Sequence, residues 1–191
     1  MSPRCFDFVI HGNLVHTPKW GQLEIIPNVY VGIKKGVIVF IENESEFEHN
    51  RDKYGVTPND IHEYYDNHKF IVPGFIDLHV HSAQYAYAGT GTDIPLMKWL
   101  NKYAFPSEKR LETNKFYTKL LCTKLIEKLI SHGTTTVQIF GTIHLKPNLI
   151  LANIIKKYGL RAFIGKVNMD QHSPNDYIEE TNESIQEYVK Y

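Results

Sequence analysis

The sequence predicts an α/β protein in which a β segment, 1–69, precedes a parallel β-sheet with helices, 70–191. Two observations support this prediction. The first part alternates apolar and polar residues over short runs separated by turn residues, as half-buried strands do. The second part alternates apolar, β-branched runs with amphipathic helical stretches. This order arises when helices connect parallel strands and cover a sheet or the outside of a barrel.

The β segment is expected to contain a hairpin. Residues 6–10 alternate like a strand, which we expect to end in a turn at His11-Gly12-Asn13. Two further apolar runs within 29–41 flank Lys34-Lys35-Gly36, whose glycine can adopt positive φ, and this arrangement is typical of a hairpin. The acidic stretch 42–48 is expected to be a solvated loop or a strand edge.

From residue 70 onward, we expect three strands in alternation with helices. Proline lacks a backbone N–H, so the helix that Asp93 can cap is expected to stop before Pro106. Gly133 and Gly159 follow two later helical stretches at positions typical of helix ends. The predicted strands are 70–81, 134–140 and 160–167, and the predicted helices are 95–105, 114–131, 147–158 and 176–191.

Charge and composition argue against several classes of partner. The 21 Lys and Arg balance the 21 Asp and Glu, which argues against nucleic acid or an anionic membrane as the main partner. No apolar run reaches the roughly 18–20 residues of a membrane span. The two cysteines, Cys5 and Cys122, cannot form a disulfide framework and suit a reducing compartment. We therefore expect a soluble protein of the cytoplasm.

The first strand of the second part carries a group of metal-ligating residue types. Asp77, His79 and His81 alternate along it, and alternate residues of a strand share one face. A buried strand that directs a carboxylate and two imidazoles into one space is destabilised by their desolvation unless something binds them. A divalent metal fits, and zinc suits imidazole best, although iron and manganese stay open. The alternative is a pair of partly exposed loop histidines hydrogen-bonded to backbone.

This strand lies within a longer motif. The first-strand motif of the amidohydrolase superfamily of metal-dependent hydrolases resembles the run Val72-Pro73-Gly74-Phe75-Ile76-Asp77-Leu78-His79-Val80-His81. Later segments make the resemblance specific to the guanine deaminase branch of that superfamily, and it covers the chain from about residue 70 onward. These segments are 81–85, 88–89, 93–106, 132–136, 142–144 and 161–170.

The resemblance implies a function. His79 and His81 would be two ligands of a catalytic zinc at the top of a (β/α)8 TIM-type barrel, where active sites of this fold lie. Gln84 would hydrogen-bond the purine ring, since an amide offers both a donor and an acceptor. Zinc would lower the pKa of a water molecule toward 7, and that water would replace the amino group of guanine, giving xanthine and ammonia. The resemblance also implies a homodimer.

The chain departs from this family in its length. A complete barrel takes roughly 250 residues, whereas residues 70–191 contain about three of its eight strand-helix units. In the family, the remaining metal ligands, a proton-transfer glutamate and an arginine of the guanine pocket come from later strands, so no catalytic residue is assigned here. A catalytic zinc normally has at least three protein ligands. We therefore expect an incomplete, truncated barrel with little or no activity alone.

Two other functions stay open. One is a different amidohydrolase that acts on an aminopurine or a pyrimidine-like ring. Lys166 would suit its two-metal version, which uses a carboxylated lysine, although that lysine usually lies on a later strand. The other is a non-catalytic truncated form that only binds partners. His144 follows the second predicted barrel strand and is interpreted as an ordinary loop histidine, and Asp77 is expected to make a structural or supporting hydrogen bond.

Overall fold

The computed structural model describes residues 6–66 and 68–190. The chain divides into two compact units, Met1–Pro73 and Gly74–Tyr191, and each is described by itself. Cys122 is buried and free, and Cys5 lies outside the described residues. None of the helices in the described part of the chain is long and apolar enough to cross a membrane.

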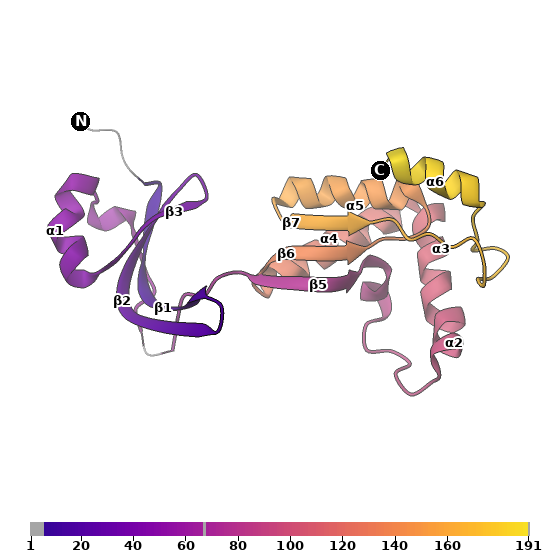
Figure 1. Ribbon diagram of the computed structural model, residues 1–191, viewed down its shortest axis with the longest axis horizontal. Helices are drawn as coiled ribbons and strands as arrows, with labels where there is room; N and C mark the ends of the chain where they lie inside the picture. Colours follow the sequence, from indigo (N-terminus) through magenta and orange to yellow (C-terminus); the bar gives the residue numbers. More distant parts are fainter. Residues whose placement is uncertain (1–5, 67, 191) are drawn as a thin grey trace. The chain divides into compact units, whose positions relative to one another are not determined.

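The first unit contains a four-stranded sheet with the strand order β3-β2-β1-β4 (Figure 1). β1, β2 and β3 pair antiparallel, and the short β4 pairs parallel with β1. Val9 of β1 and Phe47 of helix α1 are both buried and belong to one core. The elements are β1 (Phe8–Lys19), β2 (Gln22–Lys34), β3 (Val37–Asn43), α1 (Glu44–Tyr54), the 3-10 helix η1 (Pro58–Asp60) and β4 (Ile61–Glu63).

The predicted hairpin is confirmed. Lys34 of β2 pairs with Val37 of β3, so the loop between them consists of Lys35 and Gly36. These two residues have φ of 50° and 76°. Positive φ at both positions of a two-residue loop matches the twist of the flanking strands, and glycine adopts this conformation readily.

Of two other expectations for the first unit, one is wrong and one holds only in part. β1 continues through the turn expected at 11–13, and a register shift between Gly12 and Leu14 accommodates the irregularity. The acidic stretch 42–48 is expected to be a solvated loop or a strand edge. Glu42 does lie on the edge strand β3, whereas residues 44–48 begin α1. The Asn43 side chain accepts the Glu46 backbone N–H, and the Glu46 carboxylate accepts the Asn43 N–H. This reciprocal cap, together with acidic residues in the first turn, stabilises a helix N-terminus.

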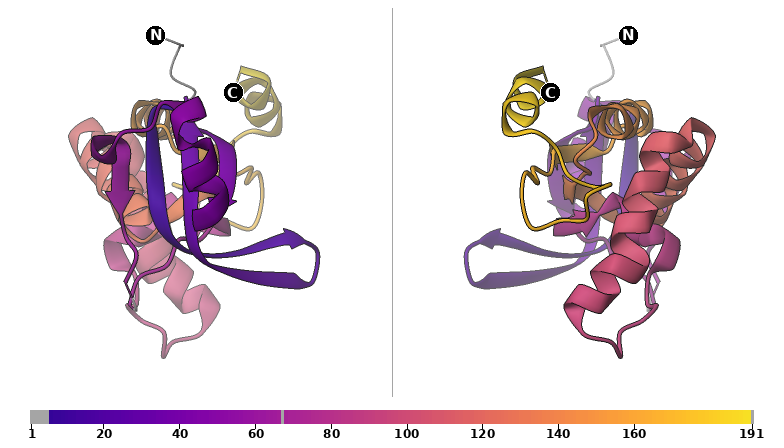
Figure 2. Two further views of the ribbon diagram at one scale, coloured as in Figure 1. Left: turned by 90° about the vertical axis from the view of Figure 1, so that its left-hand side faces the viewer. Right: turned by 90° about the vertical axis from the view of Figure 1, so that its right-hand side faces the viewer.

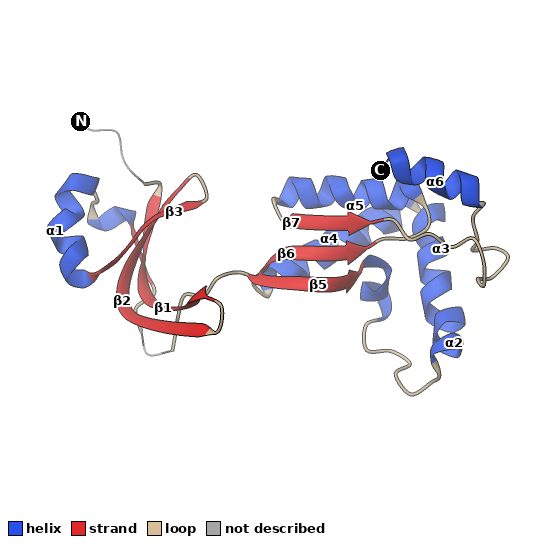
Figure 3. Cartoon of the chain, viewed as in Figure 1, coloured by secondary structure: helices blue, strands red, loops and turns tan. Residues whose placement is uncertain are grey.

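The second unit is built on a parallel sheet with the strand order β5-β6-β7 (Figure 3). Side chains of α4 and α5 cover one face through a core in which Val137 and Ile139 of β6 are 0% exposed. The predicted α/β class with a parallel sheet is therefore confirmed. The elements are β5 (Phe75–His81), the 3-10 helix η2 (Ser82–Tyr87), α2 (Leu96–Trp99), the π-helical η3 (Leu100–Ala104), α3 (Phe105–Thr113), α4 (Lys115–Ser131), β6 (Thr134–Phe140), α5 (Leu145–Tyr158), β7 (Arg161–Gly165) and α6 (Thr181–Lys190).

β5 differs from the buried strand expected at 70–81. It begins at Phe75, and the side chains of Phe75, Ile76 and Leu78 are exposed. β5 is an edge strand, which pairs with β6 on one side only among the described strands. Its apolar sequence fits a buried strand, but Ile76 and Leu78 flank Asp77, which pairs with Val137 of the helix-covered face, so they lie on the opposite face, which α4 and α5 do not cover.

α2, η3 and α3 form one continuous helix, visible in the right-hand view of Figure 2. The stop expected before Pro106 is therefore wrong. Pro106 lies in the first turn of α3, directly after a π-helical segment in which the Phe105 N–H bonds to the Leu100 carbonyl. The wider π-helical turn before Pro106 accommodates a residue that donates no backbone N–H. Asp93 does not cap the helix, because Pro95 occupies the cap position.

Candidate metal centre and adjoining pocket

The two histidines of β5 converge at its carboxyl end. The Nε2 atoms of His79 and His81 lie 3.2 Å apart. Both rings also pack on Phe140 at the end of β6, with centroid distances of 4.8 Å and 5.0 Å. Two nitrogens held by one tetrahedral zinc, each at about 2.0–2.1 Å, lie about 3.3–3.4 Å from one another. The spacing of this pair therefore fits a shared zinc ion.

Asp77 does not follow the alternation expected for the three polar residues. In the parallel register Asp77 lies opposite Val137 and Val80 lies opposite Ile139, so three steps on β5 match two on β6. This bulge puts Asp77 on the side of the helix-covered Val137, out of phase with the histidines. Its Oδ1 accepts the backbone N–H of His79 at 3.1 Å. Asp77 thus makes a hydrogen bond that shapes the bulge.

The surroundings of His81 favour neutral imidazole, which is the form that ligates a metal. Burial lowers the pKa of His81, and the neighbouring His79 adds to this effect. Imidazole nitrogens are suitable ligands for zinc, but two of them are fewer than the three protein ligands of a usual catalytic zinc site. Within residues 6–66 and 68–190, no group of three or more His, Cys, Asp or Glu side chains could hold a metal ion.

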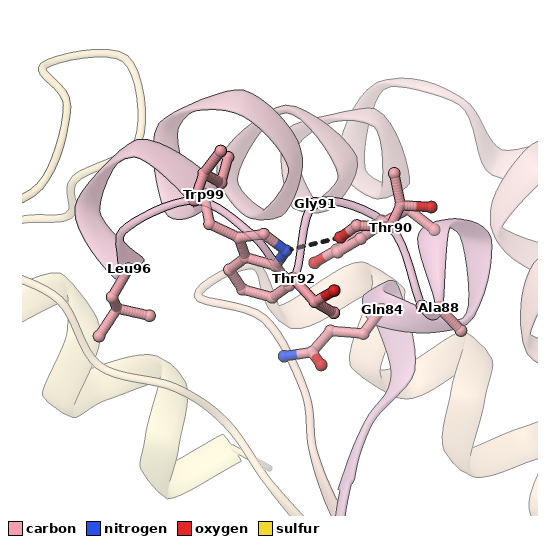
Figure 4. A pocket seen from close by; sticks show the side chains of 10 residues that line it. Gln84, Ala88, Thr90, Gly91, Thr92, Leu96 and Trp99 are labelled. Atoms are coloured by element: carbon pink, nitrogen blue, oxygen red, sulfur yellow. Dashed lines mark hydrogen bonds between the residues drawn. The ribbon is translucent and has the colours of Figure 1, made fainter.

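A pocket of about 480 Å³ lies in the segment that follows β5 (Figure 4). The Gln84 amide points into it, and the indole of Trp99 forms part of its wall. The indole N–H of Trp99 donates to the Thr90 carbonyl at 3.0 Å, which fixes the ring. The volume lies in the range of small-molecule sites. The lining residues are Gln84, Tyr87, Ala88, Gly89, Thr90, Gly91, Thr92, Ile94, Leu96 and Trp99.

Backbone geometry and aromatic packing hold this wall together. Gly91 has φ of 69°, and a Cβ there would lie 2.5 Å from the Tyr103 ring, so only glycine fits without displacing that ring. Tyr87 packs against Trp99 and Tyr103, with centroid distances of 5.5 Å and 5.9 Å. Sequence reasoning identified Gln84 but missed Trp99 and this loop. The Gly89–Gly91 pair was the available signal, since closely spaced glycines mark tight backbone approaches.

His144 and Lys166 lie apart from the histidine pair in their interactions. The His144 ring packs on Tyr177 at a centroid distance of 5.7 Å, and its burial lowers its pKa. The Lys166 side chain is fully buried, and its Nζ lies 2.6 Å from the Glu179 carboxylate. Carboxylation would make this lysine anionic and oppose it to Glu179. The pairing therefore disfavours a metal-bridging role for Lys166.

Comparison with known proteins points to one family. The sequence profile of the Amidohydrolase family matches residues 70–191. The guanine deaminase of Dictyostelium discoideum is 42% identical over 182 residues, which cover 91% of this chain and 40% of that protein. The guanine deaminase of Rattus norvegicus is 38% identical over 185 residues, covering 96% of this chain and 40% of the relative.

Solved structures give the same result. The crystal structure of guanine deaminase from C. acetobutylicum, with guanine bound in its active site, superimposes with a TM-score of 0.81 at 33% identity. The match covers 96% of this chain and 41% of that structure. The chain thus spans about 40% of the length of the proteins that it matches. Because the family profile matches well over half of its residues, the chain belongs to the amidohydrolase family.

Proposed function

We propose that this chain carries the first part of a zinc-dependent guanine deaminase site. The observation that carries the proposal is the convergence of the His79 and His81 Nε2 atoms at 3.2 Å, three residues before the pocket glutamine, Gln84. Similarity to guanine deaminases at 33–42% identity supports the choice of guanine among ring amines. The relatives are longer, so the proposed activity belongs to a complete site.

The roles of the residues follow from their chemistry. His79 and His81 would hold the metal through Nε2, and Phe140 would keep both rings oriented. When bound, zinc lowers the pKa of a water molecule and supplies the nucleophile for attack on the amino-bearing carbon. Gln84 would hold the ring edge through its amide, and Trp99 would supply a flat wall for the base. Guanine and water would yield xanthine and ammonia.

The site in this chain is incomplete, and we infer little or no turnover by the chain alone. Two imidazoles are fewer than the three protein ligands of a usual catalytic zinc. Three parallel strands would correspond to about three of the eight units of a TIM-type barrel, and residues 1–69 would form part of a small β domain. No proton-transfer residue is assigned. The family resemblance also carries the inference of a homodimer, and the free buried thiol of Cys122 supports a reducing compartment such as the cytoplasm.

Guanine binding tests the proposal directly. Trp99 lines the pocket and Trp20 is fully exposed, so a Trp20→Phe variant makes Trp99 the sole indole reporter. We expect guanine to change Trp99 fluorescence saturably, and Gln84→Ala to weaken binding about tenfold, because a buried polar contact is lost. Exposed Gln186, replaced by Ala, is the control. Equal guanine affinity of the two alanine variants would contradict the role of Gln84.

Turnover and specificity complete the test. The chain is incubated with guanine and zinc, and ammonia release is followed. Turnover at the rate of a normal enzyme would contradict the inference that the chain alone is incomplete. Adenine and cytosine in the fluorescence titration separate guanine from the alternative aminopurine and pyrimidine ligands. Tighter binding of either one would reject guanine as the preferred base.

A further inference from the structure

Three consecutive residues of α3 connect two parts of the second unit. The Ser107 hydroxyl donates to the Ala83 carbonyl of η2 at 3.1 Å. The Glu108 carboxylate accepts the Tyr177 hydroxyl. The Lys109 ammonium pairs with Asp176 at 2.5 Å. α3 is therefore bonded on one side to the 3-10 helix that carries Gln84, and on the other to the segment between β7 and α6.

That second segment, 166–180, is itself firmly held. The buried Lys166–Glu179 ion pair joins its two ends at 2.6 Å. The second oxygen of Glu179 accepts the Met169 N–H at 2.8 Å. Tyr177 is only 1% exposed and packs against Phe105 of α3 with a centroid distance of 5.3 Å. Tyr177 is thus a fixed anchor against which α3 rests.

On its other side, α3 leads into the pocket wall. It continues without a break from α2, which carries Trp99. Glu108 also acts on Tyr87 of the pocket lining: burial raises the pKa of the Tyr87 phenol, and the Glu108 charge raises it further. Tyr87 in turn packs on Trp99. A displacement of Glu108 would therefore reach the Trp99 wall of the pocket through the continuous helix.

We propose that Tyr177 is a positioning residue for the Gln84 pocket, because its hydroxyl holds Glu108 and thereby fixes α3 against η2. The inference rests on the proposed function in that the ligand of the pocket is a purine base. Without the phenol, the half-buried Glu108 carboxylate loses the Tyr177 donor, and α3 must turn toward another partner or toward water. The Ser107 contact to Ala83 lies one residue away and would change with it.

The test removes the hydroxyl and keeps the ring. In the Trp20→Phe background, Tyr177→Phe retains packing on Phe105, and Tyr188→Phe on the exposed face of α6 is the matched control. Glu108→Gln keeps a carbonyl acceptor for the phenol and serves as the conservative variant. We expect Tyr177→Phe to speed amide hydrogen exchange in residues 82–104 about tenfold, and to weaken guanine binding about tenfold. Glu108→Gln is expected to change both far less.

The outcomes separate this inference from the proposed function. Faster exchange in 82–104 with weaker guanine binding supports the positioning role. If the background chain binds no guanine, the proposed function fails, and the exchange measurement alone decides the positioning role. If exchange rises only within 105–113 and 166–180, or if guanine affinity equals that of the Tyr188→Phe control, then Tyr177 has a local structural role and the inference is overturned.

Discussion

β6 and β5 have similar apolar sequences and lie side by side in one sheet, yet their burial differs. In β6, Val137 and Ile139 are 0% exposed beneath α4 and α5. In β5, Ile76 and Leu78 are 65% and 64% exposed. The apolar pattern predicts both strands, because β-branched and aliphatic residues favour extended backbone. Burial depends on which face of the sheet a side chain takes. Asp77 pairs with Val137 on the face that α4 and α5 cover, so Ile76 and Leu78 on either side of Asp77 point to the opposite, uncovered face.

The same difference bears on the candidate site. The carboxyl end of β5 holds His79 and His81, and Phe140 of the neighbouring strand packs on both rings. The buried core beneath β6 contains the apolar side chains Val137 and Ile139 and neither of the two candidate metal ligands. The candidate metal ligands His79 and His81 lie on β5, whose apolar side chains Ile76 and Leu78 are exposed. The contrast can be measured by comparing substitutions of a buried and an exposed apolar side chain, and of a buried and an exposed ion pair, by their effect on the free energy of unfolding.

The largest effect is expected in the core of β6. Ile139 is 0% exposed, so Ile139→Ala removes buried aliphatic carbons from the core. This substitution should lower the free energy of unfolding by about 4 kcal/mol. Leu78→Ala on β5 should change it by no more than about 0.5 kcal/mol, because Leu78 is already largely in water. Urea denaturation measures both. Equal losses would mean that β5 is covered in solution.

Ion pairs offer a second contrast. Lys166→Ala leaves the Glu179 carboxylate buried beside the Met169 N–H and should lower the free energy of unfolding by about 3 kcal/mol. Lys124→Ala breaks the exposed pair with Glu127 and should lower it by less than about 1 kcal/mol. The same denaturation experiment compares them. A Lys166→Ala loss as small as that of Lys124→Ala would remove the ion pair as an anchor of segment 166–180.

A smaller, pH-dependent effect is expected at Glu108. Burial raises the pKa of its carboxyl in the folded chain, while the Tyr177 hydrogen bond opposes that shift. The folded state therefore binds a proton more readily than the unfolded state, and the Glu108 contribution to stability falls as the pH rises through this range. Glu108→Gln stays neutral, so its stability relative to wild type should increase from pH 4 to pH 7.

Unfolding measured at these two pH values checks the sign of this effect. Exposed Glu180, replaced by Gln, is the control for the removal of one surface carboxylate. A Glu108→Gln variant that gains nothing at pH 7 over pH 4 would show that the carboxyl is not disfavoured by burial in the folded chain.

Local sequence signals predicted much of the fold. The strand expected at 134–140 and the helix expected at 114–131 match β6 and α4, because their periodicities and the Asn114 cap are local. The helix expected at 176–191 begins only at Thr181, since the preceding residues are occupied by contacts to α3. α1 was missed because its acidic side chains resemble a solvated loop, although Asn43 and Glu46 form a cap.

The site was predicted only in part. The spacing of His79 and His81 predicted that their rings leave β5 together, and the 3.2 Å separation of their Nε2 atoms agrees with this. The bulge at Asp77 is set by the register with β6, which a single sequence does not reveal. The Tyr177–Glu108 contact joins residues 69 positions apart. Such pairings depend on the tertiary fold, so no local pattern signals them.

A zinc titration monitored by ¹⁵N NMR of the imidazole nitrogens tests most directly whether His79 and His81 share one metal ion. In the ¹⁵N-labelled chain, we expect the Nε2 resonances of both histidines to move together at the same zinc concentration. We also expect His79→Ala to abolish the response of His81 and His81→Ala to abolish that of His79, while His132→Ala leaves both responses unchanged. Independent responses of the two rings, or unchanged His81 behaviour in His79→Ala, would contradict a shared metal ion.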